Sequence, residues 1–241
     1  ANLWGWHTAF FAIGVMCVAV GVLANYSVPK LDAHVAHAKD KHVLHAMGQV
    51  LGEHNQRMAL LLSGTMLFSA FTIIPYITLY LQNNHVMASN EIPWLYFCGG
   101  VVTLFSGRWV GGLTDRLGKR QTFQRAALFS IIPMFAVTLL EPMPLPLVLL
   151  VTTVLFFAMN ARMIPGMALL TSAANPKFRG TFMSLNGAVQ SFSMGIASWV
   201  GGMLLQSEPS GQVTHYWLCA VVATCASLLA YQLAKRVAMH E

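Results

Sequence analysis

The chain has 241 residues, of which 56% are hydrophobic and 9% are charged, and its mean hydropathy is +0.60. A soluble fold of this length needs more ionic surface, so the composition excludes a soluble globular domain and predicts a membrane protein. The formal net charge of +6 does not indicate nucleic acid, because the basic residues lie at the ends of apolar segments, where membrane topology and lipid headgroups account for them. We therefore expect membrane lipid, and no nucleic acid, among the partners.

Seven apolar segments follow one another along the chain. They lie near residues 8–28, 58–81, 93–113, 123–140, 146–171, 182–205 and 215–234. A helix needs roughly 20 apolar residues to cross about 30 Å of hydrocarbon, whereas a transmembrane strand needs about half that number. The segments therefore predict an all-α, polytopic membrane helix bundle of about seven spans, in which each helix satisfies its own backbone polar groups.

The spans predict three regions. Residues 1–28 form a first span, residues 29–57 a cytoplasmic linker that contains histidines, and residues 58–241 a unit of six helices. The chain opens with Ala1 and no basic segment precedes the first apolar run, so we expect no signal peptide and a start within a longer protein. The four cysteines lie in apolar segments without CxxC spacing and are interpreted as small buried hydrophobic residues.

Lysine and arginine gather in every second connection and at the end of the chain. The basic positions are Lys30, Lys39, Lys41, Arg57, Arg116, Lys119, Arg120, Arg125, Lys177, Arg179, Lys235 and Arg236, with Arg108 just inside a span. In the connections between these basic ones, the charged residues are all acidic: Glu91, Glu141 and Glu208. Because short cytoplasmic loops retain Lys and Arg, the pattern predicts a multi-pass protein of the inner (plasma) membrane, with its N-terminus outside and its C-terminus in the cytoplasm.

The linker carries five of the nine histidines, namely His34, His37, His42, His45 and His54. Two pairs at a spacing of three residues would suit zinc or nickel, but no cysteine assists and the flanking lysines repel a cation. We therefore expect no metal site and no cofactor. Leu44, Met47 and Leu51 recur at helical spacing, which favours an amphipathic helix on the inner leaflet.

The most specific local pattern joins the third and fourth spans. It comprises Gly111, Leu113, Asp115, Arg116, Gly118, Lys119 and Arg120. Two helices must reverse direction here, so we expect a turn of about ten residues in which glycines supply positive φ angles and charged side chains stay in water. Asp115 is expected to face a helix N-terminus, where the dipole favours an anion by about 0.3–1 kcal/mol.

This pattern resembles the G-x-L-x-D-R-x-G-[RK]-[RK] loop motif of the major facilitator superfamily. Further segments that resemble this family begin at Gly5, Pro75 and Asn175. The resemblance covers nearly the whole chain and aligns its seven spans with family helices six to twelve. It implies the C-terminal half of a facilitator fold plus one preceding helix, with the loop motif acting in gating.

The resemblance also implies a function. A facilitator-type transporter moves a small-molecule substrate by alternating access, here of the drug or sugar efflux type and proton-linked, and the missing N-terminal half would be its partner. Since all eight acidic residues lie in loops or at ends, the coupling carboxylate is expected in that missing half. The alternative is a truncated, transport-inactive protein that serves as a structural or assembly subunit of a membrane complex.

Two other classes are disfavoured. A retinal-binding receptor needs a lysine inside its last span, and residues 215–234 contain none. An enzyme is not expected either, because the sequence shows no set of nucleophile, base and oxyanion donors and no phosphate-binding glycine loop.

Polar residues within the spans are candidates for a substrate path. They are Arg162, Asn160, Tyr76, Tyr80, Asn186 and Gln190. Arg162 either reaches the inner interface or lines the path. The two amides Asn186 and Gln190 share one helix face and either line the path or form hydrogen bonds between helices, and the tyrosines line its outer end or form an interfacial aromatic belt.

Two patterns in the spans concern helix shape and packing. Pro165 and Gly166, just beyond Arg162, allow that span to bend. The sixth span carries small residues at Gly187, Ser191, Gly195, Ser198 and Gly202. Their spacing predicts close contact with a neighbouring helix.

Overall fold

A computed structural model describes residues 5–27, 43–84 and 86–239. The chain divides into two units at the boundary between residues 42 and 43. The first contributes one helix, α1 (Gly5–Ser27), whose window Phe10–Ser27 is long and apolar enough to cross a membrane. The histidines at positions 34, 37 and 42, for which no metal site is expected, lie outside the described residues.

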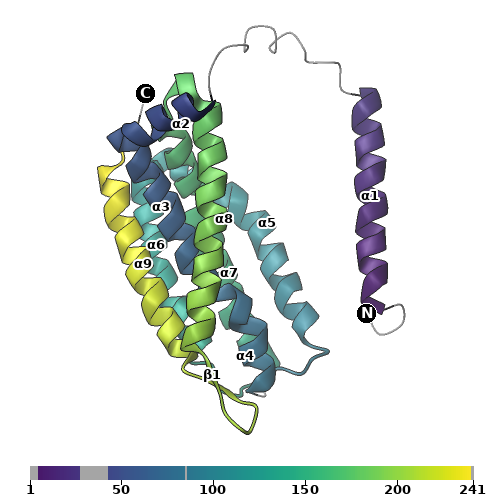
Figure 1. Ribbon diagram of the computed structural model, residues 1–241. Coiled ribbons are helices and arrows are strands. Elements are labelled where there is room, and N and C mark those ends of the chain that lie inside the picture. The colour runs from purple at the N-terminus through teal and green to yellow at the C-terminus, as the bar shows by residue number, and fades with distance from the viewer. Residues whose placement is uncertain (1–4, 28–42, 85, 240–241) are drawn as a thin grey trace. The chain divides into compact units, whose positions relative to one another are not determined.

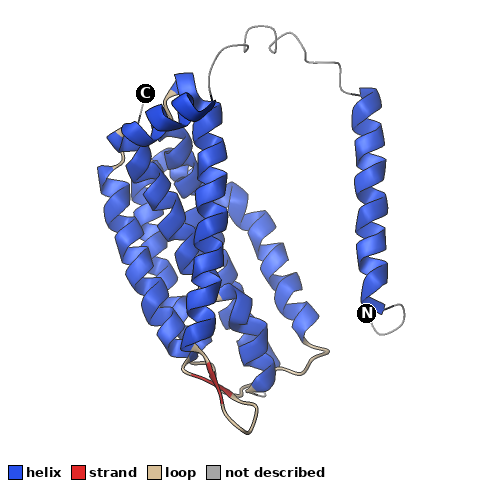
Figure 2. Ribbon diagram, viewed as in Figure 1, coloured by secondary structure: helices blue, strands red, loops and turns tan. Residues whose placement is uncertain are grey.

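The second unit is a bundle of helices (Figure 1). In chain order its elements are α2 (Val43–Gly52), α3 (His54–Phe71), η2 (Ile74–Tyr76), α4 (Ile77–Asn83), α5 (Ile92–Leu117), α6 (Lys119–Thr138), α7 (Leu145–Ala173), η3 (Pro176–Phe178), α8 (Arg179–Leu204), β1 (Gln206–Ser207), β2 (Val213–Thr214) and α9 (Tyr216–Arg236). The two short strands pair antiparallel, with Gln206 opposite Thr214. Helix therefore dominates the described chain (Figure 2), and the expected all-α bundle is confirmed.

The helices of the second unit pack around α3 and α7. Helix α3 contacts α7, α8 and α9, α7 contacts α5 and α6, and α6 packs along α9. Two apolar clusters fill the interior. One contains Leu81, Leu155 and Tyr216, and the other contains Met66 and Phe182. These interhelical contacts leave one side of α5 and one side of α8 uncovered within the unit, as the exposed rings of Phe105 and Phe192 show.

Membrane-spanning character varies among the helices. By length and composition, the described residues contain four candidate spans: the window in α1, His54–Asn83, α7 and α9. The span expected at residues 93–113 corresponds to α5, that at 123–140 to α6 and that at 182–205 to α8, with 26, 20 and 26 residues. These three are long enough to span but more polar, because their ends carry the basic residues and α8 carries amides and serines.

The second expected span is not one continuous helix. Helix α3 ends at Phe71, a short 3₁₀ segment follows, and α4 resumes at Ile77. Pro75 has no backbone N–H and restricts the residue before it, so the regular α-helical pattern stops here. The backbone groups at the break are satisfied locally, since the N–H of Ile73 donates to Ala70 O at 3.2 Å and that of Tyr76 to Ile73 O at 3.1 Å.

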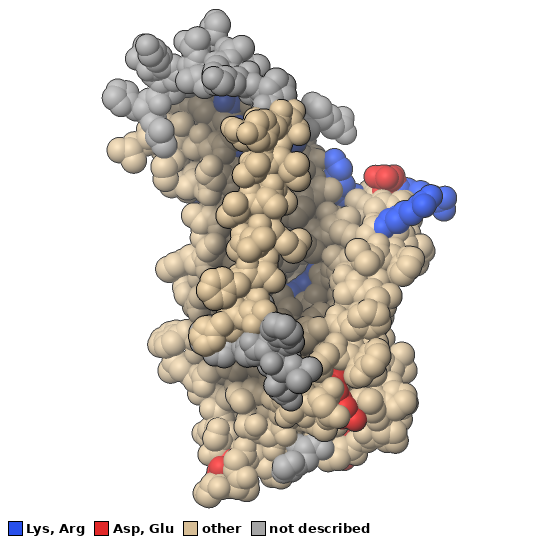
Figure 3. Space-filling view, turned by 90° about the vertical axis from the view of Figure 1, so that its right-hand side faces the viewer, with Lys and Arg blue, Asp and Glu red and all other residues tan. Residues whose placement is uncertain are grey.

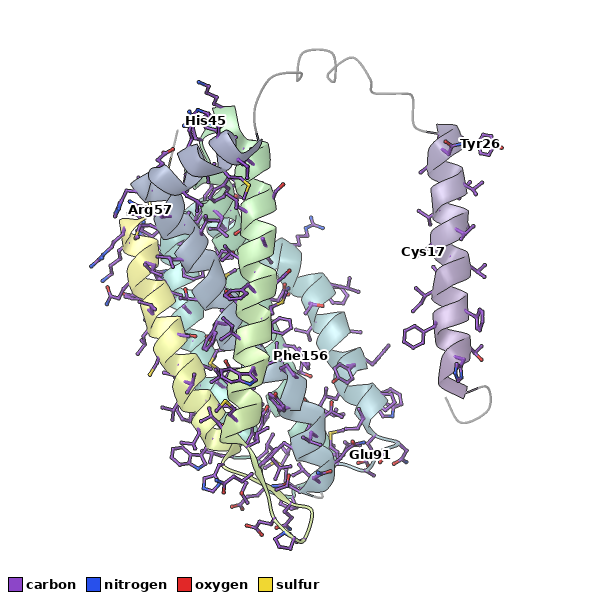
Figure 4. All side chains as sticks on the ribbon, viewed as in Figure 1. Cys17, Tyr26, His45, Arg57, Glu91 and Phe156 are labelled. Atoms are coloured by element: carbon purple, nitrogen blue, oxygen red, sulfur yellow. The ribbon has the colours of Figure 1, made fainter. Side chains whose placement is uncertain are left out.

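The basic helix ends meet at one end of the bundle. Arg120 at the start of α6 donates to Val237 O after α9 at 2.7 Å, and Asn55 in α3 donates to Ala238 O at 2.9 Å. Figure 4 labels Arg57 and Glu91 near opposite ends of the unit, and in Figure 3 most visible Lys and Arg lie in the upper half. The alternation of charge along the sequence thus becomes a charge polarity of the folded bundle.

Candidate functional site

The loop motif is much shorter in the structure than the sequence suggests. Helix α5 continues to Leu117 and α6 begins at Lys119, so Gly118 alone separates them. Gly118 has φ 86° and ψ 148°, a conformation that glycine adopts without steric cost. The expected turn of about ten residues is therefore wrong: a single glycine reverses the chain, while Gly111 and Gly112 are helical with open space around them.

The charged residues of the motif divide into two groups. The ammonium group of Lys119 donates to Ser172 Oγ of α7 at 2.5 Å, and Arg120 is bonded to Val237 O. Asp115 and Arg116 are exposed and make no hydrogen bond or ion pair with another described residue. The helix N-terminus expected opposite Asp115 is thus not found among its described partners, and Asp115 itself lies in the last turn of α5, where the dipole disfavours an anion.

Arg162 lies inside the bundle, with 2% of its surface exposed. From α7, its Nη1 donates to Ser69 Oγ of α3 at 3.1 Å and to Ser227 Oγ of α9 at 2.9 Å, and its Nη2 donates to Met66 O at 3.2 Å. The two serine hydroxyls also bond to each other at 2.8 Å. Arg162 therefore joins three helices. Of the two interpretations from the sequence, the one in which Arg162 reaches the inner interface does not hold in this conformation.

The other polar candidates are also bonded across helices. Asn160 of α7 donates to Ser106 Oγ of α5 at 2.6 Å and is half-buried. Tyr80 is 9% exposed, and its hydroxyl donates to Leu140 O at 2.9 Å. Tyr76 is half-buried and donates to Ser198 O of α8. Tyr80 therefore belongs to the core near the acidic end of the bundle, not to an exposed aromatic belt.

The two amides on α8 differ in how they are satisfied. Gln190 donates to Ser63 Oγ of α3 at 2.8 Å and remains half-buried. Asn186, one turn earlier, is 3% exposed, and its carbonyl oxygen has no hydrogen-bond partner in the structure. A buried acceptor without a partner is uncommon, and among the described path candidates this oxygen is the one buried side-chain atom that lacks a hydrogen-bond partner.

Close helix approach occurs at only one end of the small-residue row that the sequence indicates, at Gly202, and at the neighbouring Gly201. Gly187 and Gly195 have open space where a Cβ would lie, whereas a Cβ on Gly201 would lie 2.7 Å from the Tyr76 ring and 2.9 Å from Thr72 O. Gly202 is also close, 2.8 Å from the Tyr76 hydroxyl. The 3₁₀ break between α3 and α4 therefore packs directly on the glycine pair of α8.

Sequence reasoning missed the hydroxyl partners of these groups. The serines at positions 63, 69, 106 and 227 are buried within apolar segments and accept the bonds from Gln190, Arg162 and Asn160. Small hydroxyl residues at helix interfaces are a known means of joining membrane helices, and that signal was present in the sequence. Among the described residues, no group of three His, Cys, Asp or Glu side chains is placed to hold a metal ion.

A comparison with protein families shows to which family the chain belongs. The family model of the Major Facilitator Superfamily matches residues 1–161 and 59–239. The chain belongs to the major facilitator superfamily. A comparison with curated proteins gave no match. The bundle from α3 to α9 accordingly represents half of a facilitator fold, and this superfamily member is a multi-pass membrane transporter component rather than a receptor of the retinal-binding class.

Proposed function

We propose that this chain provides the C-terminal half, with one preceding helix, of a secondary active transporter that exports a small molecule such as a drug or sugar by alternating access. The broken span α3–η2–α4 carries this proposal, because transporters build substrate sites from discontinuous helices near the middle of the membrane. Helix α7 also contains Pro165 inside its length. Two neighbouring helices thus have built-in points of bending.

The candidate path lies where these helices meet α5 and α8. Asn160, Gln190 and Tyr76 are half-buried, and Asn186 has an unpaired oxygen. Tyr80 and Arg162 support the path indirectly, because each donates a hydrogen bond to a backbone carbonyl of a neighbouring segment, Leu140 O and Met66 O respectively. We assign the gating role to the loop motif because Asp115 and Arg116 have no described partner and remain available to the other half.

Coupling to protons requires a carboxylate that the described part of this half does not place within the bilayer. Glu53, Glu91, Glu141 and Glu208 lie at helix ends or in loops, and Asp115 lies in the last turn of α5. A carboxylate in the first half of the transporter would therefore perform the coupling. The test is efflux from vesicles that contain the full-length protein, with and without an imposed pH gradient, for a panel of cationic dyes and sugars.

The alternative role is that of a structural subunit, and one observation favours it: Arg162, Asn160 and Gln190 are all bonded to neighbouring helices, as packing alone would require. Mass spectrometry of the native protein separates the two roles. A continuous or associated first half, together with gradient-driven efflux, supports the transporter. A mature chain of 26.3 kDa in a stoichiometric complex without efflux would reject it.

In the proposed orientation, the basic end of the bundle lies on the cytoplasmic side of the inner (plasma) membrane. Glu208 and Lys177 are exposed and lie in connections of opposite charge. We expect Glu208→Cys to react with an impermeant thiol reagent from outside, and Lys177→Cys to react only after permeabilisation. The reactions are compared in a background without the native cysteines, and labelling of both positions from one side would reject the orientation.

A further inference from the structure

A groove lies between α5, α6 and α7 on the basic half of the bundle. It has a volume of about 240 Å³, and its walls include Trp109 and Leu113 of α5, Ala126 and Phe129 of α6, and Phe157 of α7. The rings of Trp109 and Phe157 are 5.9 Å apart, and those of Phe129 and Phe157 are 6.4 Å apart. Phe157, near the middle of α7, therefore lies between Trp109 of α5 and Phe129 of α6, and its ring closes the inner side of the groove.

The cationic group of the groove is Arg125, which lines it from the second turn of α6. Arg125 is exposed and makes no hydrogen bond or ion pair with any other described residue. Arg116 lies on α5 one turn beyond Leu113, is also exposed, and likewise has no described partner. Arg125 thus makes one part of the groove positively charged, whereas the rest of its lining, apart from Thr122, is apolar and aromatic.

This arrangement suits one kind of occupant. Small-molecule sites usually have volumes of about 300–1,000 Å³ and several convergent polar groups, whereas this groove is smaller and its remaining polar lining group, the Thr122 hydroxyl, already donates to Gly118 O at 3.0 Å. The adjoining surface is apolar and suited to contact with lipid chains, since Ile132 of α6 is 70% exposed and Leu104 of α5 is 79% exposed. A ligand must therefore be amphipathic, with a negative head and an apolar tail.

We propose that the groove binds one anionic phospholipid of the leaflet at the basic end of the bundle. The phosphate lies against the Arg125 guanidinium, with Arg116 adding to the positive potential, and one acyl chain lies between Trp109 and Phe129 down to Phe157. Basic pockets between membrane helices attract anionic headgroups, and each nearby Lys or Arg strengthens the attraction. Arginine offers paired donors to phosphate, which favours this headgroup over a neutral zwitterion.

The test is native mass spectrometry of the full-length protein in detergent, titrated with phosphatidylglycerol or with phosphatidylcholine of the same acyl composition. We expect one phosphatidylglycerol to bind more tightly than phosphatidylcholine. Arg125→Gln should weaken phosphatidylglycerol about fivefold and leave phosphatidylcholine unchanged. Ala126→Trp should fill the groove and remove the bound copy of either lipid, whereas Arg57→Gln, at an exposed arginine on α3, serves as the matched charge control.

Other results overturn the proposal. Equal binding of both lipids shows that the arginine does not select the headgroup, and an equal loss in Arg57→Gln shows diffuse attraction to the basic end. Retention of phosphatidylglycerol by Ala126→Trp with a native thermal unfolding transition places the lipid elsewhere. No tightly bound copy in the wild-type protein means that another part of the transporter covers the groove.

Discussion

Arg162 shows how a charge can be accommodated at membrane depth without a carboxylate. An arginine at the centre of a membrane helix opposes insertion by about 2.5–3.5 kcal/mol. In the folded bundle, two hydroxyls and one carbonyl on α3 and α9 accept its hydrogen bonds. The arginine thereby connects α7 to the part of α3 immediately before its break, so one side chain contributes both to packing and to the geometry of the candidate path.

Replacement of this arginine separates insertion from packing. We expect Arg162→Leu to improve insertion of α7 but to lower the free energy of unfolding by about 2 kcal/mol, the sum of three interhelical bonds of about 0.6 kcal/mol each. Unfolding of the full-length protein in mixed micelles measures the second effect. Arg108→Leu is the control, because Arg108 is exposed and has no described partner. An Arg162→Leu protein as stable as the wild type would contradict a packing role.

The sequence singles out Arg162 as a polar residue within a span, but it does not show which residues Arg162 contacts. Arg162 stands out because charges are rare in apolar segments. Its acceptors Ser69 and Ser227 are separated from it by 93 and 65 residues, and no local pattern pairs positions so far apart. The choice between a lipid-facing and an interior arginine depended on helix rotation, which tertiary packing sets.

At the scale of elements, the packing of the broken span on α8 is constrained by backbone as well as by side chains. A Cβ on Gly201 would meet both the Tyr76 ring and the backbone oxygen of Thr72. The sequence indicated that α8 uses small residues for packing, but spacing alone gives several equivalent rows. Pro75 determines which row is used, because the break that it produces brings Tyr76 to the height of Gly201 and Gly202.

Two alanine substitutions on α8 test this contact. We expect Gly201→Ala to lower the free energy of unfolding by about 1–3 kcal/mol, because the added methyl group meets backbone that cannot move aside easily. Gly195→Ala is the matched control, since its Cβ would lie in open space, and it should be neutral or stabilise the helix by up to about 1 kcal/mol. Thermal unfolding of both variants gives the comparison. Equal effects would show that the α3–α8 approach is not close at Gly201.

The turn between α5 and α6 also shows the limit of motif reading. The motif located the reversal of the chain correctly, and Gly118 has the positive φ that the glycine pattern suggested. Its length was overestimated because charged residues were assumed to lie in a loop. In the structure Asp115 and Arg116 extend α5 instead, since both side chains are exposed in its last turn and reach water without unwinding the backbone.

At the scale of the whole molecule, the bundle has one basic end and one acidic end. The alternation of charge predicted this polarity from sequence alone, because it depends only on which connections carry Lys and Arg. The division of the loop motif is a property of the assembled fold. Lys119 and Arg120 are bonded within the bundle, whereas Asp115 and Arg116 are not. A carboxylate without a partner in its own half is suited to interact with the other half.

This division of the loop motif leads to a prediction for two of its charged residues, Asp115 and Arg120. We expect Asp115→Asn to leave the stability of the C-terminal bundle within about 0.5 kcal/mol of wild type, because no described contact is lost, and to reduce efflux by the full-length transporter. Arg120→Gln, unlike Asp115→Asn, should affect stability. It removes the bond to Val237 O, so it should lower the free energy of unfolding of the bundle by about 1 kcal/mol. Unfolding and vesicle efflux are measured on the same preparations. If Asp115→Asn destabilised the bundle as much as Arg120→Gln does, its partner would lie within this chain, and the proposed gating contact with the first half would have to be abandoned.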